Sequence, residues 1–136
     1  MIAYITYLFL KASSFFVNLL PEDFALRLGR QLGKVWYYLD FGHRRVAIQN
    51  LRTAFSREKS AYEIRGIARR TFQNLGMMAV EFFRIPRIDM ETFRRRVKME
   101  GLAEALALLE KKKGALLLIG HFGNWELMGL MSKVIG

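Results

Sequence analysis

The chain has 136 residues, of which 52% are hydrophobic, carries a formal net charge of +10 and contains no cysteine. This length suits one modest domain with a real core, and the absence of cysteine excludes a disulfide framework and any thiolate metal site. The two histidines, His43 and His121, are too far apart in the sequence to suggest metal-ligand spacing. We therefore expect no metal site and no cofactor.

The positive charge is unevenly distributed along the chain. Residues 1–26 contain one basic residue, Lys11, and the other 21 lysines and arginines follow. An apolar beginning followed by a basic body favours an anionic membrane surface or acidic partners. Nucleic acid is the rival explanation. We expect no nucleic-acid binding, because the cations are spread over several expected helices without a recognisable docking motif.

Residues 1–20 predict an apolar helix about 30 Å long, close to the thickness of a bilayer's hydrocarbon core. The segment lacks the basic start and the small-residue cleavage site of a signal peptide. Lys11 would cost about 2.5–3.5 kcal/mol at the centre of a bilayer. It belongs, however, to a narrow stripe that can face the protein or the headgroups: Tyr4, Tyr7, Lys11, Ser14 and Asn18. We expect a membrane anchor, either spanning or interfacial; an ordinary core helix is the alternative.

Pro21 is expected to open a second helix, because proline is tolerated in a first turn. Its large apolar side chains share one face, and its basic side chains share another. The apolar face comprises Phe24, Leu28, Leu32, Val35 and Leu39; the basic face comprises Arg27, Arg30 and Lys34. If the first helix spans a membrane, these cations place the body of the chain on the cytoplasmic side.

Two more helices are expected before residue 86. Residues 43–55 predict the first, and its His43 is expected to be a surface residue rather than a catalyst. Ser60 and Glu63 have the spacing of a capping box, which predicts the start of a long helix that Pro86 ends.

After Pro86 the pattern changes. We expect a short strand over residues 97–100, a helix over 101–113, a fully apolar strand over 115–119 and a helix from residue 124 onward. This alternation predicts an α/β fold, with a helical N-terminal layer and a membrane-associated helix followed by the start of a parallel sheet. The expected divisions are an anchor or interfacial helix over 1–20, a helical region over 21–85 and a first βαβ unit over 86–136.

The stretch IGHFGNWELMG, residues 119–129, carries the candidate chemistry. His121 directly follows the apolar strand, where ligands bind in open α/β sheets. Gly120 and Gly123 permit a turn, and Asn124 is a good N-cap for the helix that carries Glu126. A carboxylate there could orient the imidazole and stabilise it once protonated. The motif holds no serine or cysteine, so we expect His121 to act as general base toward a substrate hydroxyl. The alternative is a histidine that merely closes a tight turn.

The stretch HFGNWE resembles the H-x4-[D/E] motif of the glycerolipid and lipid A acyltransferase superfamily, and specifically that of the late acyltransferases of lipid A biosynthesis. The stretches LPEDFALRLGRQLG, HRRVAIQNLRTAF and NLGMMAVEFFR resemble the N-terminal region of that family. The resemblance implies a catalytic pair, His121 and Glu126, in which the acid orients the histidine. It also implies a motif turn comprising Gly120, Gly123, Asn124 and Trp125.

The resemblance further implies an acyl carrier protein thioester as donor and an anionic glycolipid as acceptor, at the cytoplasmic face of the inner membrane. The chain ends ten residues after Glu126, whereas family members continue for about as much chain again, so we expect it to correspond to the N-terminal part of such an enzyme. The alternative function is a non-catalytic, basic membrane-binding protein.

Overall fold

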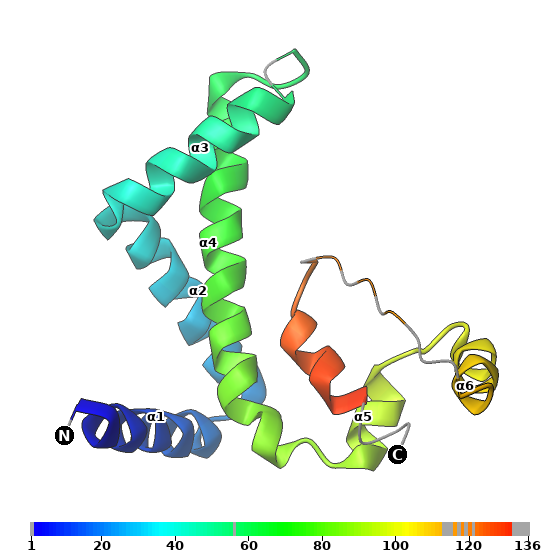
Figure 1. Ribbon diagram of the computed structural model, residues 1–136. Helices are drawn as coiled ribbons and strands as arrows, with labels where there is room; N and C mark the ends of the chain where they lie inside the picture. The colour runs from blue at the N-terminus through cyan, green and yellow to red at the C-terminus, as the bar shows by residue number, and fades with distance from the viewer. Residues whose placement is uncertain are drawn as a thin grey trace. The chain divides into compact units, whose positions relative to one another are not determined.

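The structure is a computed structural model that describes residues 2–55, 57–112, 116, 118, 120 and 122–131. The chain divides into two compact units, Met1–Arg84 and Ile85–Gly136. The first unit contains helices α1 (Ile2–Leu19), α2 (Glu22–Leu39), α3 (Phe41–Phe55) and α4 (Ala61–Arg84). Figure 1 shows α4 as the long upright helix of this unit, and α4 contacts each of the other three.

The close packing of α2 on α4 depends on small residues. The buried positions of α2 recur every fourth residue and form one face: Ala25, Gly29, Gly33 and Tyr37. A Cβ added at Gly29 would lie 2.6 Å from the carbonyl oxygen of Gly76 in α4, and one added at Gly33 would collide with the carbonyl oxygen of Phe72. The two backbones therefore touch directly, which only residues without a Cβ permit.

The core of this unit is aromatic and lies where three helices meet. Tyr37 of α2 packs with Ala68 and Phe72 of α4, and α3 adds partly buried apolar side chains to the cluster, namely Ala47, Ile48 and Leu51. The ring centroids of Tyr37 and Phe72 are 5.5 Å apart at an interplanar angle of 80°. This edge-to-face arrangement is one that aromatic pairs prefer.

Side chains cap the predicted start of α4. The Ser60 backbone N–H donates to Glu63 Oε2 at 2.8 Å, and the Glu63 N–H donates to Ser60 Oγ at 3.3 Å. This reciprocal pair confirms the predicted capping box. Pro86 lies in a short 3-10 helix, Ile85–Arg87, directly after α4 ends at Arg84. The predicted end of the long helix is thus confirmed.

Helix α1 is joined to the unit at its C-terminal end. Ser14 Oγ and Asn18 Nδ2 both donate to the carbonyl oxygen of Phe83, at 3.0 and 2.9 Å. In return, Arg84 Nη1 donates to the carbonyl oxygens of Val17 and Leu20, at 3.1 and 3.0 Å. The predicted polar stripe of α1 is therefore divided: its C-terminal members face the protein, whereas Tyr4 and Tyr7 are exposed.

No residue of α1 is buried in the structure. By length and composition the helix is apolar enough to cross a membrane. Whether it is the predicted membrane anchor or an ordinary core helix stays a prediction.

The second unit corrects the predicted fold class. Its helices are η1 (Ile85–Arg87), α5 (Met90–Arg96), α6 (Leu102–Glu110) and η2 (Trp125–Met131), and its described residues contain no strand. Residues 97–99 have no regular structure where a strand was predicted. In the predicted strand 115–119, Leu116 and Leu118 also lie outside regular structure and are 89% and 90% exposed. The predicted start of a parallel α/β sheet is therefore wrong.

The physical reason is that a strand is stabilised by ladder partners, which an apolar run alone does not supply. In this segment a side-chain cap also favours a helix over an extended backbone. Asp89 Oδ1 accepts from the Thr92 N–H at 2.6 Å and caps α5, a helix that the sequence analysis did not predict. The three arginines that directly precede the predicted strand, residues 94–96, form the end of that helix.

Candidate functional site

The described part of the motif combines local backbone hydrogen bonds with a short helix. The Phe122 N–H donates to the carbonyl oxygen of Gly120 at 2.8 Å. Gly123 has a φ of 56°, in the left-handed region that favours glycine. Gly123 thus has a backbone conformation that favours glycine.

Helix η2 begins directly after Asn124. The carbonyl oxygen of Asn124 accepts from the Leu127 N–H at 3.2 Å, so the helix starts with 3-10 bonding. Trp125 is half-buried, and Glu126 is exposed in the first turn. An acid suits this end of a helix because the unpaired backbone N–H groups there carry partial positive charge.

His121 lies outside the described residues. The predicted pairing of its imidazole with Glu126 therefore stays a prediction. Of the described residues that follow His121, Gly123 has a left-handed φ, and Glu126 lies three residues further on with its side chain exposed. A carboxylate so placed can accept a hydrogen bond from an imidazole N–H and hold one tautomer.

The other histidine has a structural partner. His43 Nδ1 lies 2.7 Å from Asp40 Oδ2, and the His43 side chain is 77% exposed. The backbone N–H of His43 and the indole N–H of Trp36 both donate to the Asp40 carboxylate, and these bonds lower the pKa of Asp40 to about 2. The prediction that His43 is a surface residue is confirmed.

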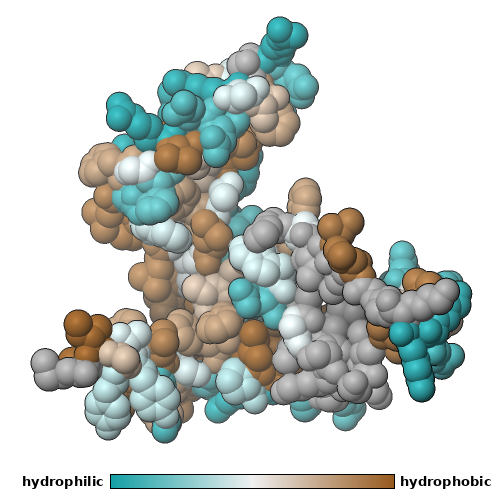
Figure 2. Space-filling view, in the orientation of Figure 1, coloured by the Kyte–Doolittle hydropathy of each residue, from teal (hydrophilic) through white to brown (hydrophobic). Residues whose placement is uncertain are grey.

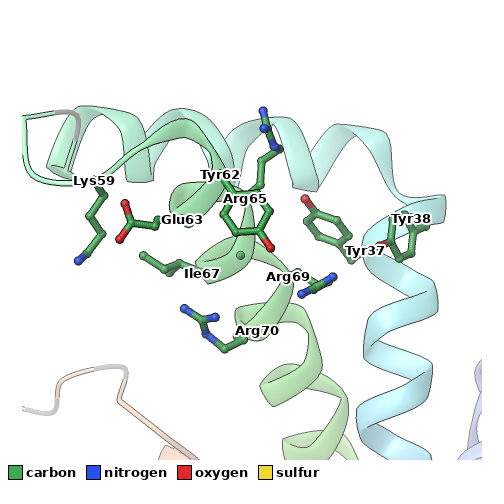
Figure 3. A pocket seen from close by; sticks show the side chains of 10 residues that line it. Tyr37, Tyr38, Lys59, Tyr62, Glu63, Arg65, Ile67, Arg69 and Arg70 are labelled. Atoms are coloured by element: carbon green, nitrogen blue, oxygen red, sulfur yellow. The ribbon is translucent and has the colours of Figure 1, made fainter.

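The first unit has an open groove of about 450 Å³ that the sequence analysis did not identify. Figure 3 shows side chains from the N-terminal part of α4 meeting Tyr37 and Tyr38 from the end of α2. The groove lining includes four cations: Lys59, Arg65, Arg69 and Arg70. Its carboxylate, Glu63, is held by Ser60, whose backbone N–H lowers the Glu63 pKa. The groove can receive an anionic group. In the sequence, the spacing of Arg65 and Arg69 by about one helical turn could have predicted that these two cations share one side of a helix.

The described residues contain no group of three or more histidine, cysteine or acidic side chains that could hold a metal ion.

The chain was compared with known proteins. The family model of the bacterial lipid A biosynthesis acyltransferases matches residues 1–134. The comparisons with curated proteins and with solved structures gave no match. The family match covers both units of the structure and includes the motif around Glu126.

Proposed function

We propose a function from one premise: the chain belongs to the bacterial lipid A biosynthesis acyltransferase family. An acyltransferase of this pathway has an acyl donor and a lipid acceptor as substrates. We propose that the donor is a fatty acyl thioester of acyl carrier protein, and that the acceptor is a hydroxyl group of a lipid A precursor or a related anionic glycolipid.

In the proposed mechanism His121 is the general base and Glu126 orients it. The imidazole removes the proton of the acceptor hydroxyl while the hydroxyl oxygen attacks the thioester carbonyl carbon. The C–S bond then breaks, and the leaving thiolate takes the proton back from the imidazolium. The Glu126 carboxylate stabilises the imidazolium between these two steps. The left-handed φ of Gly123 and the position of Glu126 in the first turn of η2 support this assignment.

The proposed location is the cytoplasmic face of the inner membrane. The apolar helix α1, whose residues are not buried, supports attachment to a bilayer. The net charge of +10 favours a surface of anionic headgroups and an anionic acceptor.

The test is acyl transfer from an acyl carrier protein thioester to a lipid A precursor in detergent micelles. We expect His121→Ala to lower the rate by about 10²–10⁴-fold, the usual contribution of a general base. Glu126→Gln should also lower it, because the imidazole loses its carboxylate partner. His43→Ala is the matched control, because it removes the chain's other histidine, and should leave the rate unchanged. Equal rates for the wild type and His121→Ala would contradict the mechanism.

A second candidate is membrane binding without catalysis. It is favoured by the exposure of the apolar side chains that precede the motif, since Leu116 and Leu118 are 89% and 90% exposed rather than enclosing a site. Under this candidate the chain binds vesicles that contain anionic lipid but transfers no acyl group in the same assay.

A further inference from the structure

Helix α2 has a second apolar face that the unit does not cover. The face packed on α4 is built from small residues and Tyr37. The large apolar side chains lie elsewhere, and their exposed fractions run from 42% to 71%: Phe24, Leu28, Leu32, Val35 and Leu39. We refer to these five residues as the α2 stripe.

The α2 stripe is continuous along the whole helix. Its members are three or four residues apart, so they share one side of a helix that is about 27 Å long. An exposed apolar patch of this extent marks an interaction surface, because leaving it in water forgoes the free energy of burial.

The connection to α1 brings this surface to the bilayer. Helix α1 ends at Leu19 and α2 begins at Glu22, so two residues separate the apolar helix from the stripe. Arg84 holds this joint through its bonds to the carbonyl oxygens of Val17 and Leu20. A bilayer that holds α1 therefore lies within reach of the first turn of α2.

Helices α1 and α2 lie on the same side of α4 in the view of Figure 1. There α1 projects to the left from the lower end of α4, and α2 slants upward to the left from the same end. Figure 2, in the same orientation, shows hydrophobic side chains along this side of the pair of α2 and α4 and around α1.

The cations of α2 match such a surface. At 100° per residue, Arg27 and Lys34 lie roughly 100–120° round the helix from the centre of the stripe, on the flank opposite the one that adjoins the face packed on α4, and Arg30 lies further round. Arg27 and Arg30 also line a small groove with Met77 of α4. An apolar stripe bordered by cations on one flank is the pattern of a helix that lies in the interface of an anionic bilayer. There the aliphatic stems of the cations border the hydrocarbon, and their charges meet the headgroups.

We propose that the α2 stripe is a second membrane-contact surface, which lies flat in the headgroup region of an anionic bilayer while α1 inserts into that bilayer along its axis. This inference rests on the membrane location in the proposed function and deepens it. The first unit is then attached to the bilayer by two elements at different depths: α1 is inserted, and the α2 stripe lies at the surface.

The chain's lack of cysteine allows a direct test, because single cysteines can be labelled without background. A polarity-sensitive fluorophore is attached to Leu28→Cys, Leu32→Cys, Arg30→Cys and Phe9→Cys in the full chain. Each of the four positions is exposed to solvent. The emission and the quenching by aqueous iodide are then measured with vesicles of phosphatidylethanolamine and phosphatidylglycerol. Far-UV circular dichroism checks that each labelled variant keeps the wild-type helix content.

We expect the labels at residues 28 and 32 to shift to shorter wavelength and to lose accessibility to iodide on addition of vesicles. The label at residue 9 should do the same, and lipids brominated far down their acyl chains should quench it more strongly than the two α2 labels. The label at residue 30 should keep its accessibility to iodide, because Arg30 lies on the opposite side of α2.

Three results would overturn the proposal, and each has a different meaning. If the label at residue 9 enters the lipid while those at 28 and 32 stay as accessible as the one at 30, α1 alone binds the bilayer. If the label at residue 9 also stays in water, the membrane location in the proposed function fails as well. If the labels at 28 and 32 become shielded without vesicles as protein concentration rises, the stripe is a contact between copies of the chain.

Discussion

At the scale of single residues, Asp40 connects two helices. It lies between α2 and α3, and its carboxylate oxygens accept from the indole N–H of Trp36 and the backbone N–H of His43 at 3.0 and 2.9 Å. Its own backbone N–H bonds to the carbonyl oxygen of Trp36. One carboxylate thus satisfies a donor at the start of α3 and fixes a side chain at the end of α2.

This geometry predicts a pH dependence of stability. The pKa of Asp40 is lowered from 3.8 to about 2 in the folded chain, so its ionised form favours the folded state. That contribution is fully present above pH 3.8 and is lost as pH falls toward 2. We expect the melting temperature of Asp40→Asn to fall less over this interval than that of the wild type, as followed by circular dichroism in detergent. If the melting temperatures of the two proteins fall equally over this pH interval, Asp40 is not the group responsible.

At the scale of elements, the α2–α4 contact depends on the absence of side chains. Gly76 of α4 faces Gly29 and Gly33 of α2, and a Cβ at any of the three would meet backbone of the other helix. The contact therefore cannot relax by a rotamer change. It sets the separation of the two helices and, with it, the position of the exposed α2 stripe.

We expect Gly33→Ala to lower the free energy of unfolding by about 1–3 kcal/mol, the usual cost of overpacking, although alanine normally favours a helix. Gly66→Ala is the control in α4. There the added Cβ would meet only the flexible end of Arg70, at 3.6 Å, so stability should rise by about 0.5–1 kcal/mol. Urea unfolding of both variants measures the difference. Destabilisation by both substitutions to the same extent would show that the close contact is not the cause.

The joint between α1 and α4 offers a second prediction at this scale. Arg84→Ala removes two charged hydrogen bonds to carbonyl oxygens at the end of α1, which are worth about 1–3 kcal/mol in all. We expect limited proteolysis near Leu20 to become roughly tenfold faster, because cleavage follows local opening. Arg69→Ala, on an exposed part of the same helix, should digest at the wild-type rate. If Arg84→Ala is also digested at the wild-type rate, the hydrogen bonds of Arg84 do not hold α1 to α4.

At the scale of the whole molecule, the net charge of +10 and the exposed α1 together predict a two-part attachment to membranes. The electrostatic part is worth about 1 kcal/mol for each basic residue near an anionic surface and is screened by salt. The apolar part is not screened.

We therefore expect added salt to weaken sedimentation of the chain with anionic vesicles without abolishing it, and to change sedimentation with neutral vesicles little. Duplex DNA should not displace the chain from anionic vesicles at moderate salt, because the cations follow no nucleic-acid docking pattern. Complete release by salt would leave α1 without an anchoring role, and ready displacement by DNA would support the rival nucleic-acid function.

Much of the first unit could be predicted from the sequence. Periodic apolar residues, Pro21, the Ser60–Glu63 capping box and Pro86 locate its helices, because caps and proline act on the backbone within a turn. The resemblance carried by the motif around His121 and Glu126 is confirmed by the family match over residues 1–134. The pairing of those two side chains stays a prediction; Gly123, which lies between them in the sequence, has a left-handed φ.

The sequence by itself thus determined the helices of the first unit and the family, since both depend on local chemistry and on a short motif. Only the tertiary structure decided which face of α2 packs. Hydropathy points to Phe24 and Leu28, whereas Gly29 and Gly33 make the contact, because close approach depends on the shape of the partner helix. It likewise decided against strands at residues 97–100 and at Leu116 and Leu118, since a strand exists only through its pairing with another segment.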